Sequence, residues 1–549
     1  MRNLIVCCDG TWNTPDDMDG DIPAPTNVVR LYNSLADKGG NGQEQCSYYH
    51  PGVGTEGSRW QRVKEGGLGD GLDKNIKSAY RWLAAIYKPD DAIFLFGFSR
   101  GAYTVRSLSG MIARCGLLDA PMAQSEQREE EIWDTIDLIF ANYREPPSYD
   151  AAGNKTVPQL QASPEMPFHN VEPGQSSYKT TAIHFIGVWD TVGSLGVPDD
   201  LGYLWFLGDP AKHHFHDTEL GDSVAHARHA VAMDEIRQSF LPTLWTNLEQ
   251  HKDAKQIWFP GVHSDIGGGY ADRGLADAAL EWMIGEASAE SLGISLAFKP
   301  KSLAQIVPDH QGLLHDSVTG VFKTLKTCPR AVPRFTGEDL ALTFHDSAIK
   351  RQSDPPISTF AYRPQRSLPA EVDVRARYQW HDTGIYLEGG VAYDFTAVGQ
   401  WIDGTIRCGP AGADDGNFQA SRIAHFVGSL AGKLEPLLQL IPRNENADAF
   451  VSKRVDEYPW FSLVGVVANG YRKLPDGHGP LDPKGVPIDE KERDIFLRTP
   501  PHETFLIGES ATFTPRIGGY LLCFANDAWY HYENNRGSVH LTVKARSLR

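Results

Sequence analysis

The chain contains 549 residues, of which 41% are hydrophobic and 22% charged, and its formal net charge is −18. This composition excludes a wholly disordered chain, and the acidic balance disfavours nucleic acid as a partner and purely electrostatic attachment to anionic lipid. At about 150 residues per domain, the length predicts two to four structural units.

The cysteines and the N-terminus bear on the compartment in which the chain is made. Seven cysteines are scattered along the chain without a CxxC pair, and this odd number is typical of reduced thiols. The first apolar run, residues 4–8, ends at Asp9 and is too short for a cleavable signal, and no run of about 18 apolar residues predicts a spanning helix. We therefore expect cytoplasmic synthesis without a cleaved signal, and export only by a specialised secretion system.

Short apolar runs indicate the fold class of the N-terminal part. Continuous runs of this kind are typical of strands buried inside a parallel sheet. The runs that predict strands cover residues 4–8, 92–96, 183–189 and 256–262. Because helix-like segments lie between them, the sequence predicts an α/β fold, an α/β-hydrolase-like and mostly parallel sheet.

Changes of character along the chain predict its division into domains. We expect a catalytic domain over residues 1–440 in which polar and Pro-rich stretches form cap insertions. These insertions are expected at about 120–180 and in parts of 195–250 and 290–420. A polar linker at 441–456 precedes apolar runs that alternate with turn signals, and these predict a small all-β sandwich over 457–549.

Residues 97–101, Gly-Phe-Ser-Arg-Gly, match the G-x-S-x-G pattern. Its glycines permit a sharp turn from strand to helix that exposes the hydroxyl of Ser99. The pattern is short, but its place between an apolar strand and a helix-like segment is the context that the motif requires. The sequence therefore predicts Ser99 as a catalytic nucleophile, with an inert serine in a glycine-rich turn as the alternative.

A serine hydroxyl needs a base, and the base needs an acid that orients it. In this fold class the chain order is serine, then acid, then histidine. Asp190 and His263 each directly follow one of the apolar runs, where α/β sheets place their active sites. We predict Asp190 as the acid and His263 as the base, with Asp265 as the main rival acid and Asp234 as a weaker one.

The charge that develops on a substrate carbonyl oxygen needs two N–H donors. We expect the backbone of Arg100, next to the nucleophile, to supply one donor. The turn after the first strand, at Gly10 and Thr11, is the best candidate for the other, and a plain connecting turn is the alternative. This chemistry requires no cofactor.

Five motifs resemble those of the bacterial phospholipase effectors of type VI secretion and of the uncharacterised α/β-hydrolases grouped with them. The motifs are DGTWN at 9–13, PTNVVRLY at 25–32, GFSRGAYTVRSLSG at 97–110, GVWDTVGSLG at 187–196 and FPGVHSDIGGGY at 259–270. The resemblance covers about residues 1–430. It implies Ser99 as nucleophile, Asp190 as acid and His263 as base, and hydrolysis of phospholipids or related acyl esters.

A dense apolar and aromatic run, LGYLWFL at 201–207, lies outside the predicted core strands. Exposed, such a run would form a lid or an interfacial patch that makes a peripheral membrane contact. A cap helix packed on the body of the domain is the alternative.

The end of the chain is similar to the PA-I-type galactose-binding lectins, which are calcium-dependent bacterial β-sandwiches. The resemblance rests on YLLCFANDAWYHYENNRGSVHLTVKA, residues 520–545. It implies Ca²⁺ ligands at Asp527, at the carbonyl of His531, and at Asn534 and Asn535. Carboxylate, amide and carbonyl oxygens are the ligands that Ca²⁺ prefers.

The same resemblance implies that a galactose-type glycan is held by the calcium and by Asp527 and Asn534. A further calcium ligand is expected from the carbonyl of Leu474, and His478 is a candidate sugar contact. A β-sandwich without metal is the alternative.

Together these observations predict a two-module lipid hydrolase, with lipid or another acyl ester as substrate. Two other functions stay open. The protein could be an esterase for acyl esters that are not lipids, or a glycan-binding delivery protein whose hydrolase site is vestigial.

Overall fold

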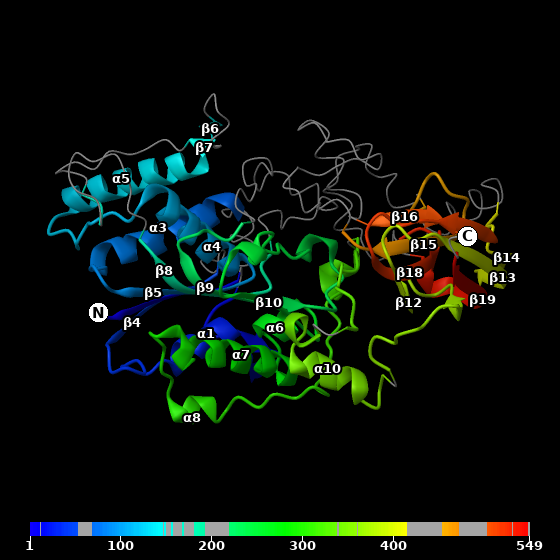
Figure 1. The fold of residues 1–549 in the computed structure, drawn as a ribbon, viewed down its shortest axis with the longest axis horizontal. Helices are drawn as coiled ribbons and strands as arrows, with labels where there is room; N and C mark the ends of the chain where they lie inside the picture. Colours follow the sequence, from blue (N-terminus) through cyan, green and yellow to red (C-terminus); the bar gives the residue numbers. More distant parts are fainter. Residues whose placement is uncertain are drawn as a thin grey trace. The chain divides into compact units, whose positions relative to one another are not determined.

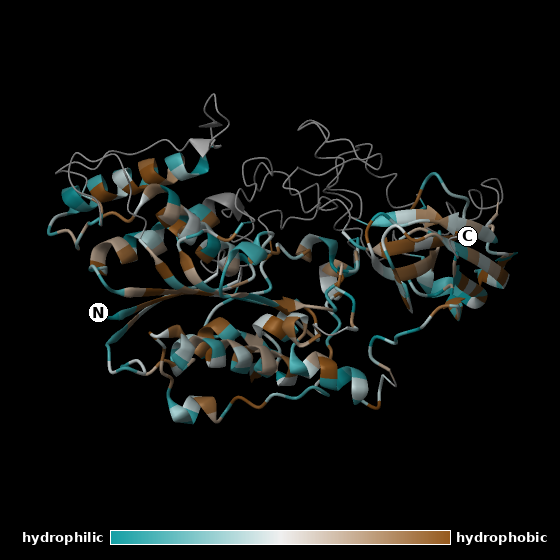
Figure 2. Cartoon of the chain, in the orientation of Figure 1, coloured by the Kyte–Doolittle hydropathy of each residue, from teal (hydrophilic) through white to brown (hydrophobic). Residues whose placement is uncertain are grey.

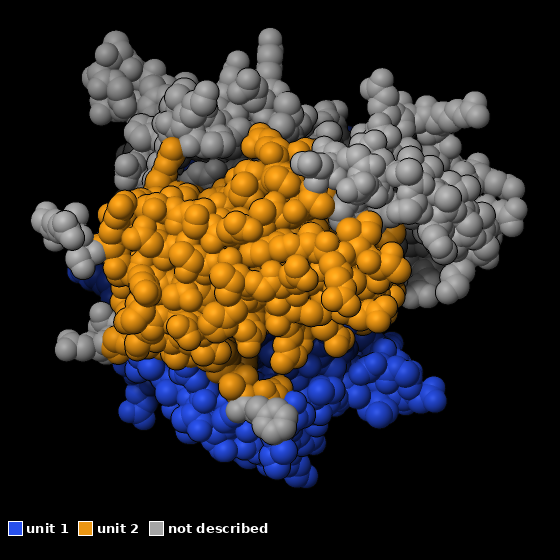
Figure 3. Space-filling view, turned by 90° about the vertical axis from the view of Figure 1, so that its right-hand side faces the viewer, with its two compact units in different colours: residues 1–318, 338–358 blue, residues 319–337, 359–549 orange. Residues whose placement is uncertain are grey.

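The structure is a computed structural model that describes residues 1–10, 13–52, 68–145, 148–149, 155–156, 167–169, 181–192, 219–324, 326–337, 340–359, 361–413, 453–470, 502–529 and 531–546. The chain divides into two compact units, which Figure 3 colours separately. Unit 1 comprises residues 1–318 and 338–358, and unit 2 comprises residues 319–337 and 359–549.

Unit 1 is built on a six-stranded sheet in the order β10-β9-β8-β5-β1-β4 (Figure 1). Every neighbouring pair in it is parallel. The strands are β1 (Asn3–Cys8), β4 (Gln45–His50), β5 (Ala92–Phe98), β8 (Ile183–Trp189), β9 (Val224–Ala232) and β10 (Ala254–Phe259). The predicted α/β class with a mostly parallel sheet is confirmed.

Helices cover both faces of this sheet, with α3, α4 and α5 on one side and α1, α6 and α7 on the other (Figure 1). The helices of unit 1 are α1 (Asn27–Ser34), α3 (Leu68–Ile86), α4 (Arg100–Cys115), α5 (Glu126–Arg144), α6 (His263–Gly267), α7 (Gly274–Ala287), α8 (Pro300–Leu303), α9 (Leu340–Thr343) and α10 (Asp346–Ser353). Two short hairpins pair β2 (Met18–Asp19) with β3 (Ile22–Pro23) and β6 (Ser148–Tyr149) with β7 (Lys155–Thr156).

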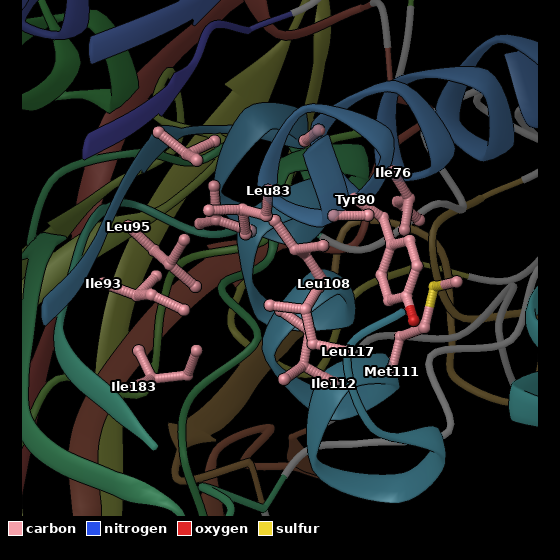
Figure 4. Close-up of a cluster of buried hydrophobic side chains, with 14 of the residues drawn as sticks. Ile76, Tyr80, Leu83, Ile93, Leu95, Leu108, Met111, Ile112, Leu117 and Ile183 are labelled. Carbon is pink, nitrogen blue, oxygen red and sulfur yellow. The ribbon is translucent and has the colours of Figure 1, made fainter. Parts of the chain in front are cut away.

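The sheet is apolar on both faces because successive side chains of a strand point to opposite sides. In β1, Leu4 and Val6 join the cluster under α3 and α4, whereas Ile5 and Cys7 join the cluster under α1 and α7. Figure 4 shows part of the first cluster, in which Leu83 and Leu108 from the helices lie between Leu95 of β5 and Tyr80 of α3. Full burial of each such aliphatic side chain contributes about 1.5–3 kcal/mol.

The first expected cap insertion, about 120–180, contributes a helix to this layer. Ser125 caps α5 by accepting the N–H of Arg128. Hydrophobic and polar residues alternate along α5 (Figure 2), and its buried residues Ile132, Ile136 and Ile139 join the cluster under α3 and α4. The described part of this insertion thus packs on the helices beside the sheet. Residues 201–207 lie outside the described residues.

Two core strands were not predicted. The β9 sequence VAHARHAVA lies within 195–250, parts of which were expected to form a cap insertion, yet it is an interior strand of the sheet. Its polar residues are tolerated because Arg228 is paired with Asp253 and Glu286. The other missed strand, β4, lies at the sheet edge and is polar in part, so its apolar pattern is weak.

Unit 2 is a β-sandwich of two antiparallel sheets, one ordered β11-β19-β13-β14 with β17 also on β13, the other ordered β12-β18-β15-β16. Its strands are β11 (Ala370–Arg375), β12 (His381–Leu387), β13 (Tyr393–Asp403), β14 (Ile406–Cys408), β15 (Leu463–Ala468), β16 (Glu503–Leu506), β17 (Ser510–Phe513), β18 (Gly519–Ala525) and β19 (Asn535–Ala545). Side chains from both sheets form one core, among them Trp401 and Leu541 of the first sheet and Leu463 and Leu521 of the second. The predicted C-terminal β region is confirmed.

The start of this sandwich differs from the expected boundary at 441–456. Residues 370–408, expected within the catalytic domain of residues 1–440, supply β11 to β14 of the sandwich. β13 pairs with β19 along its whole length, from Tyr393 opposite Ala545 to Asp403 opposite Asn535. Because that partner lies more than a hundred residues away, the local pattern of β13 could not reveal it. Residues 441–452 lie outside the described residues. Among the helices that the structure describes, none is long and apolar enough to span a membrane.

Candidate active site

Ser99 occupies a sharp turn between β5 and α4. Its backbone φ of 56° and ψ of −119° lie in a region that non-glycine residues rarely adopt. Flanking glycines make this turn sterically feasible, since a Cβ at Gly101 would lie 2.0 Å from the carbonyl oxygen of Cys8, and a Cβ at Gly97 would lie 2.4 Å from that of Gly101. The strained turn therefore packs directly against the end of β1, in the strand–turn–helix context that the sequence predicted.

Asp190 and His263 meet at the same edge of the sheet. Asp190 directly follows β8, and His263 begins α6 shortly after β10. The Nδ1 of His263 lies 2.5 Å from Oδ2 of Asp190, whose Oδ1 accepts the N–H of Ala232 at 2.9 Å. Both residues are buried, His263 with 4% and Asp190 with 0% of its surface exposed. The structure thus joins two of the three residues that the sequence singled out.

Burial and charge act in opposite directions on the imidazole of His263. Burial lowers its pKa from the ordinary value, and the Asp190 carboxylate raises it. Because the net direction is downward, the ring is neutral near pH 7. A neutral ring that donates from Nδ1 carries its lone pair on Nε2, which is the form a general base requires.

Two aromatic rings fix the position of the His263 ring. The ring centroid of Phe98 lies 4.6 Å from that of His263, and the centroid of Phe240 lies 4.9 Å away at a steep angle. Phe98 is the last residue of β5 and directly precedes Ser99. A Cβ at Gly267 would lie 1.9 Å from the Phe98 ring, so α6 packs closely on it. Through Phe98, the helix that carries the imidazole contacts the strand that carries the serine.

The turn after β1 lies beside the serine. A Cβ at Gly10 would lie 3.3 Å from the Cβ of Ser99, but the N–H of Gly10 donates to Oδ1 of Asp9 at 2.8 Å. Thr11 lies outside the described residues. Arg100 is the first residue of α4, at a helix N-terminus, where backbone N–H groups favour negative charge.

Asp9 is a buried carboxyl beside this site, and its role could not be inferred from the sequence. It also accepts hydrogen bonds from the hydroxyls of Thr26 at 2.7 Å and Tyr49 at 2.9 Å. Burial raises its pKa to about 6, although these hydrogen bonds act in the opposite direction. Its signal in the sequence is a charged residue directly after a continuous apolar strand.

The rival acids hold other groups. Asp265 accepts the ring N–H of His315 at 2.6 Å and the backbone N–H of Val262 at 3.0 Å. Asp234 accepts the N–H of Gly261 at 2.8 Å. Both carboxylates therefore anchor the turn before His263, whereas Asp190 contacts the imidazole itself.

A second polar cluster lies in unit 2, at residues of the predicted calcium site. The Nδ2 of Asn535 donates to Oδ2 of Asp527 at 2.9 Å, and both side chains are buried. The Oδ1 of Asn535 is also buried, and it has no hydrogen-bond donor among the described residues. Since a buried acceptor without a donor is costly, this oxygen is suited to a cation.

Asp403 belongs to the same cluster and was missed by sequence reasoning. It is buried at the end of β13, opposite Asn535 in the sheet, and its Oδ1 accepts the Nδ2 of Asn534 at 2.7 Å. The residues of this pair are 131 positions apart, so no local signal could have revealed it. The predicted contacts Leu474 and His478 lie outside the described residues. In the described part of the chain, no group of three or more His, Cys, Asp or Glu side chains is arranged to hold a metal ion.

Sequence comparisons place these features among known proteins. Residues 2–286 match the family described as "T6SS, Phospholipase effector Tle1-like, catalytic domain". The "Uncharacterized protein YEL023C" of Saccharomyces cerevisiae is 30% identical over 259 residues, which are 45% of this chain and 33% of that protein. The chain therefore spans about a third of the length of this curated relative.

Solved structures with similar regions include a crystal structure of an uncharacterized protein from Pseudomonas aeruginosa, with 18% identity and a TM-score of 0.31 over 56% of this chain and 49% of that one. The "EclA N-terminal domain; PllA-like lectin" shows 15% identity and a TM-score of 0.17 over 32% of this chain and 95% of that one. The Tle1 effector bound to the VgrG spike of the type 6 secretion system shows 16% identity and a TM-score of 0.23 over 50% and 52%. These TM-scores are too low to establish a common arrangement of the whole chain.

Proposed function

The chain belongs to the family of type VI secretion phospholipase effectors with a Tle1-like catalytic domain, and from this premise we propose that it is a serine hydrolase that cleaves acyl ester bonds in lipids. The observation that carries the proposal is the buried hydrogen bond between Asp190 and His263, at the sheet edge where Ser99 occupies its strained turn.

In this proposal the hydroxyl of Ser99 attacks the ester carbonyl while Nε2 of His263 takes its proton. Asp190 keeps the proton of the ring on Nδ1 and stabilises the imidazolium that forms. The imidazolium then protonates the leaving alcohol, and an acyl-enzyme remains on Ser99. Water attacks the acyl-enzyme with His263 again as base, which releases the fatty acid and restores the serine.

The oxyanion of each tetrahedral intermediate needs N–H donors aimed at it. We propose the N–H of Arg100 as the first donor, because α4 begins at this residue. The turn at Gly10 and Thr11 is the proposed source of the second. Gly10 serves in this role only by exchanging its bond to Asp9 for a bond to the substrate oxygen.

Hydrolysis of phospholipid vesicles and of short and long p-nitrophenyl esters by wild type and Ser99→Ala tests this function. We expect Ser99→Ala to lower kcat by about 10⁴-fold or more. Ser107→Ala is a matched control, because this buried serine lies on the same helix, two turns further along. Mass spectrometry of the lipid products identifies the bond that is cleaved. Equal rates for wild type and Ser99→Ala would favour the alternative of a delivery protein with a vestigial site, and activity on short esters alone would favour a non-lipid esterase.

We also propose that unit 2 binds Ca²⁺ and, through it, a galactose-type glycan. The residues fit the ion, because the buried Oδ1 of Asn535 has no donor in the described part of the chain and the Asp527 carboxylate accepts the Nδ2 of the same amide. Calcium here would be held by Asp527, Asn534, Asn535 and the carbonyl of His531, and it would supply coordination to vicinal sugar hydroxyls. A weak glycan binder joined to the hydrolase raises the local concentration of substrate at a glycan-bearing membrane surface.

A glycan array with the whole chain, run in Ca²⁺ and in chelator, tests this second function. We expect binding to galactose-terminated glycans that chelator abolishes and that Asp527→Asn lacks, while Ser99→Ala binds as wild type does. Binding that is unaffected by chelator would contradict the role of calcium. Export by a type VI secretion system follows from family membership as a further proposal, and its test is loss of the protein from culture supernatant when the secretion sheath is disabled.

A further inference from the structure

The turn that carries the proposed base is surrounded by carboxylates. Residues 261–263 follow β10, and residues 233–235 follow β9, the neighbouring parallel strand, so both segments emerge at the same edge of the sheet. Asp234 exchanges two hydrogen bonds with Gly261, since its N–H donates to the Gly261 carbonyl at 3.0 Å and its Oδ2 accepts the Gly261 N–H at 2.8 Å. The two strand ends are thereby joined.

Three successive N–H groups of this turn donate to three different carboxylates. The N–H of Gly261 donates to Asp234, that of Val262 to Asp265 at 3.0 Å, and that of His263 to Oε2 of Glu235 at 3.2 Å. Gly261 has a φ of +126°, so the turn has a shape that few residues adopt. Such a turn needs anchoring if the imidazole is to stay in place.

Glu235 is the most buried and most fully bonded of these carboxylates. Its side chain is 0% exposed and forms an ion pair with Arg237, whose NH2 lies 2.7 Å from Oε2. Its Oε1 accepts the Nε–H and backbone N–H of Arg237 at 2.9 and 2.8 Å, and the hydroxyl of Ser317 at 2.9 Å. The carboxylate that accepts these hydrogen bonds also accepts the backbone N–H of the proposed base, His263.

Arg237 also reaches the base from another side. Its guanidinium lies 3.6 Å from the ring centroid of Phe240, and the Phe240 ring also contacts the ring of His263 at a centroid distance of 4.9 Å. The ion pair thus fixes the backbone of His263 through Glu235 and one face of its ring through Phe240. The contact through Glu235 and the contact through Phe240 both end on His263, as expected of groups that position this residue.

We propose that Glu235 is a positioning residue for His263, and that the cluster of Glu235, Arg237 and Ser317 holds the imidazole in register with Ser99 and Asp190. This inference rests on the proposed function, in which His263 is the base. Glu235, Arg237 and Ser317 contact neither the substrate nor the reacting atoms in this proposal, and no motif in the sequence indicated them.

The cluster also places opposite charges near the base. The charged groups on the elements around His263 are Asp190 after β8, Asp234, Glu235 and Arg237 after β9, Asp265 on α6, and Arg100 on α4. Of these, Glu235 raises the pKa of His263 and Arg237 lowers it, in addition to the contribution of Asp190. Removing Glu235 should therefore lower the pKa of the base, and removing Arg237 should raise it.

Kinetics on Glu235→Gln, Arg237→Gln and Ser317→Ala test the proposal, with Glu286→Gln as matched control. Glu286 likewise binds an arginine, Arg228, in unit 1, but this pair joins the end of α7 to the middle of β9 rather than to the turn of His263. We expect Glu235→Gln to lower kcat between about 10-fold and 100-fold while KM changes less than about twofold, because a small displacement of a catalytic group acts on the chemical step. The acidic limb of kcat/KM should move to lower pH in Glu235→Gln and to higher pH in Arg237→Gln, and stay in place in Glu286→Gln.

The result that overturns the proposal is a folded Glu235→Gln with the wild-type kcat and pH profile, or a loss of activity no greater than its unfolded fraction explains. Where Glu235→Gln does not fold, Ser317→Ala and Arg237→Gln decide. The proposal is then overturned if Ser317→Ala has the wild-type kcat and Arg237→Gln has the wild-type acidic limb of kcat/KM. NMR titration of histidine rings labelled at Cε1, with the His263 signal assigned from His263→Gln, measures the same two pKa shifts without turnover. It separates the two proposals, because the shifts are expected even if wild type and Ser99→Ala hydrolyse esters equally.

Discussion

Unit 1 and unit 2 both gather buried polar side chains at the end of a sheet, but they satisfy those side chains differently. In unit 1, Asp190 accepts hydrogen bonds from the imidazole of His263 and from the backbone N–H of Ala232, so both oxygens of its carboxylate have donors within the protein. In unit 2, the buried Oδ1 of Asn535 has no donor among the described residues. A buried acceptor without a donor costs about 1–3 kcal/mol, which a bound cation would offset. The comparison teaches that the first site should work without added ligand and that the second should respond to one.

The largest expected effect separates the two candidate acids of unit 1. Asp190→Asn should lower kcat by about 10⁴-fold, because an amide favours the wrong tautomer of His263. Asp265→Asn should cost far less, since Asp265 contacts His315 and the turn rather than the imidazole. Steady-state kinetics on a p-nitrophenyl ester measure both. Similar losses in the two variants would remove the distinction drawn here between an orienting acid and a turn anchor.

The next effect tests how closely the serine turn packs in unit 1. Gly101→Ala should destabilise unit 1 by about 3 kcal/mol or more, because its Cβ would lie 2.0 Å from the backbone oxygen of Cys8 and cannot be accommodated by side-chain movement. Circular dichroism at 222 nm follows the helices of unit 1 during thermal unfolding. Gly285→Ala is the control, because nothing lies within 4 Å of its added Cβ and alanine favours a helix. A Gly101→Ala protein with the wild-type Tm would contradict the close packing of the serine turn.

Calcium should act on unit 2 alone. At a concentration a hundred times its Kd, a ligand that binds only the folded state stabilises it by about 2.7 kcal/mol. We expect Ca²⁺ to raise the Tm of unit 2, Asp527→Asn to abolish the rise, and Asp403→Asn to reduce it, since Asp403 orients the amide of Asn534. Differential scanning calorimetry in Ca²⁺ and in chelator measures these shifts. A rise of the same size in Asp527→Asn would place the ion elsewhere.

The smallest effect concerns Asp9, a buried carboxyl of unit 1 that accepts hydrogen bonds from uncharged groups, the N–H of Gly10 and the hydroxyls of Thr26 and Tyr49. The pKa of Asp9 is about 6 in the folded chain against an ordinary value of 3.8. Because the folded value is raised, the stability contributed by its protonated form is complete below pH 3.8 and is lost as pH rises to about 6. Asp9→Asn, which stays neutral, should therefore gain stability relative to wild type over this range, by a net amount of about 1 kcal/mol once weaker hydrogen bonds are allowed for.

Thermal unfolding of both proteins from pH 4 to pH 7 measures this difference. A Tm difference that stays constant with pH would show that Asp9 is ionised throughout. Thr26→Val is the control, because it removes one hydrogen bond to Asp9 and leaves the carboxyl in place.

Several features of unit 1 could be predicted from residues that are close together in the sequence. The strands β1, β5 and β8 are continuous apolar runs, and the glycines around Ser99 mark a turn that only a strand–helix junction uses. Asp190 and His263 were identified because each follows a predicted strand. The strand predictions succeeded because burial on both faces of a parallel sheet leaves a strong local pattern.

The sequence by itself thus determined the fold class of unit 1, the turn that presents Ser99 and the two strand ends that bear an acid and a histidine. Only the tertiary structure decided that β13 belongs to the sandwich, that Asp403 meets Asn534, and that Glu235 and Ser317 support the turn of His263. Half-buried strands and single hydrogen bonds join residues that are distant in the chain, and neither leaves a periodic pattern. Such pairs are selected by three-dimensional packing, so local sequence does not record them.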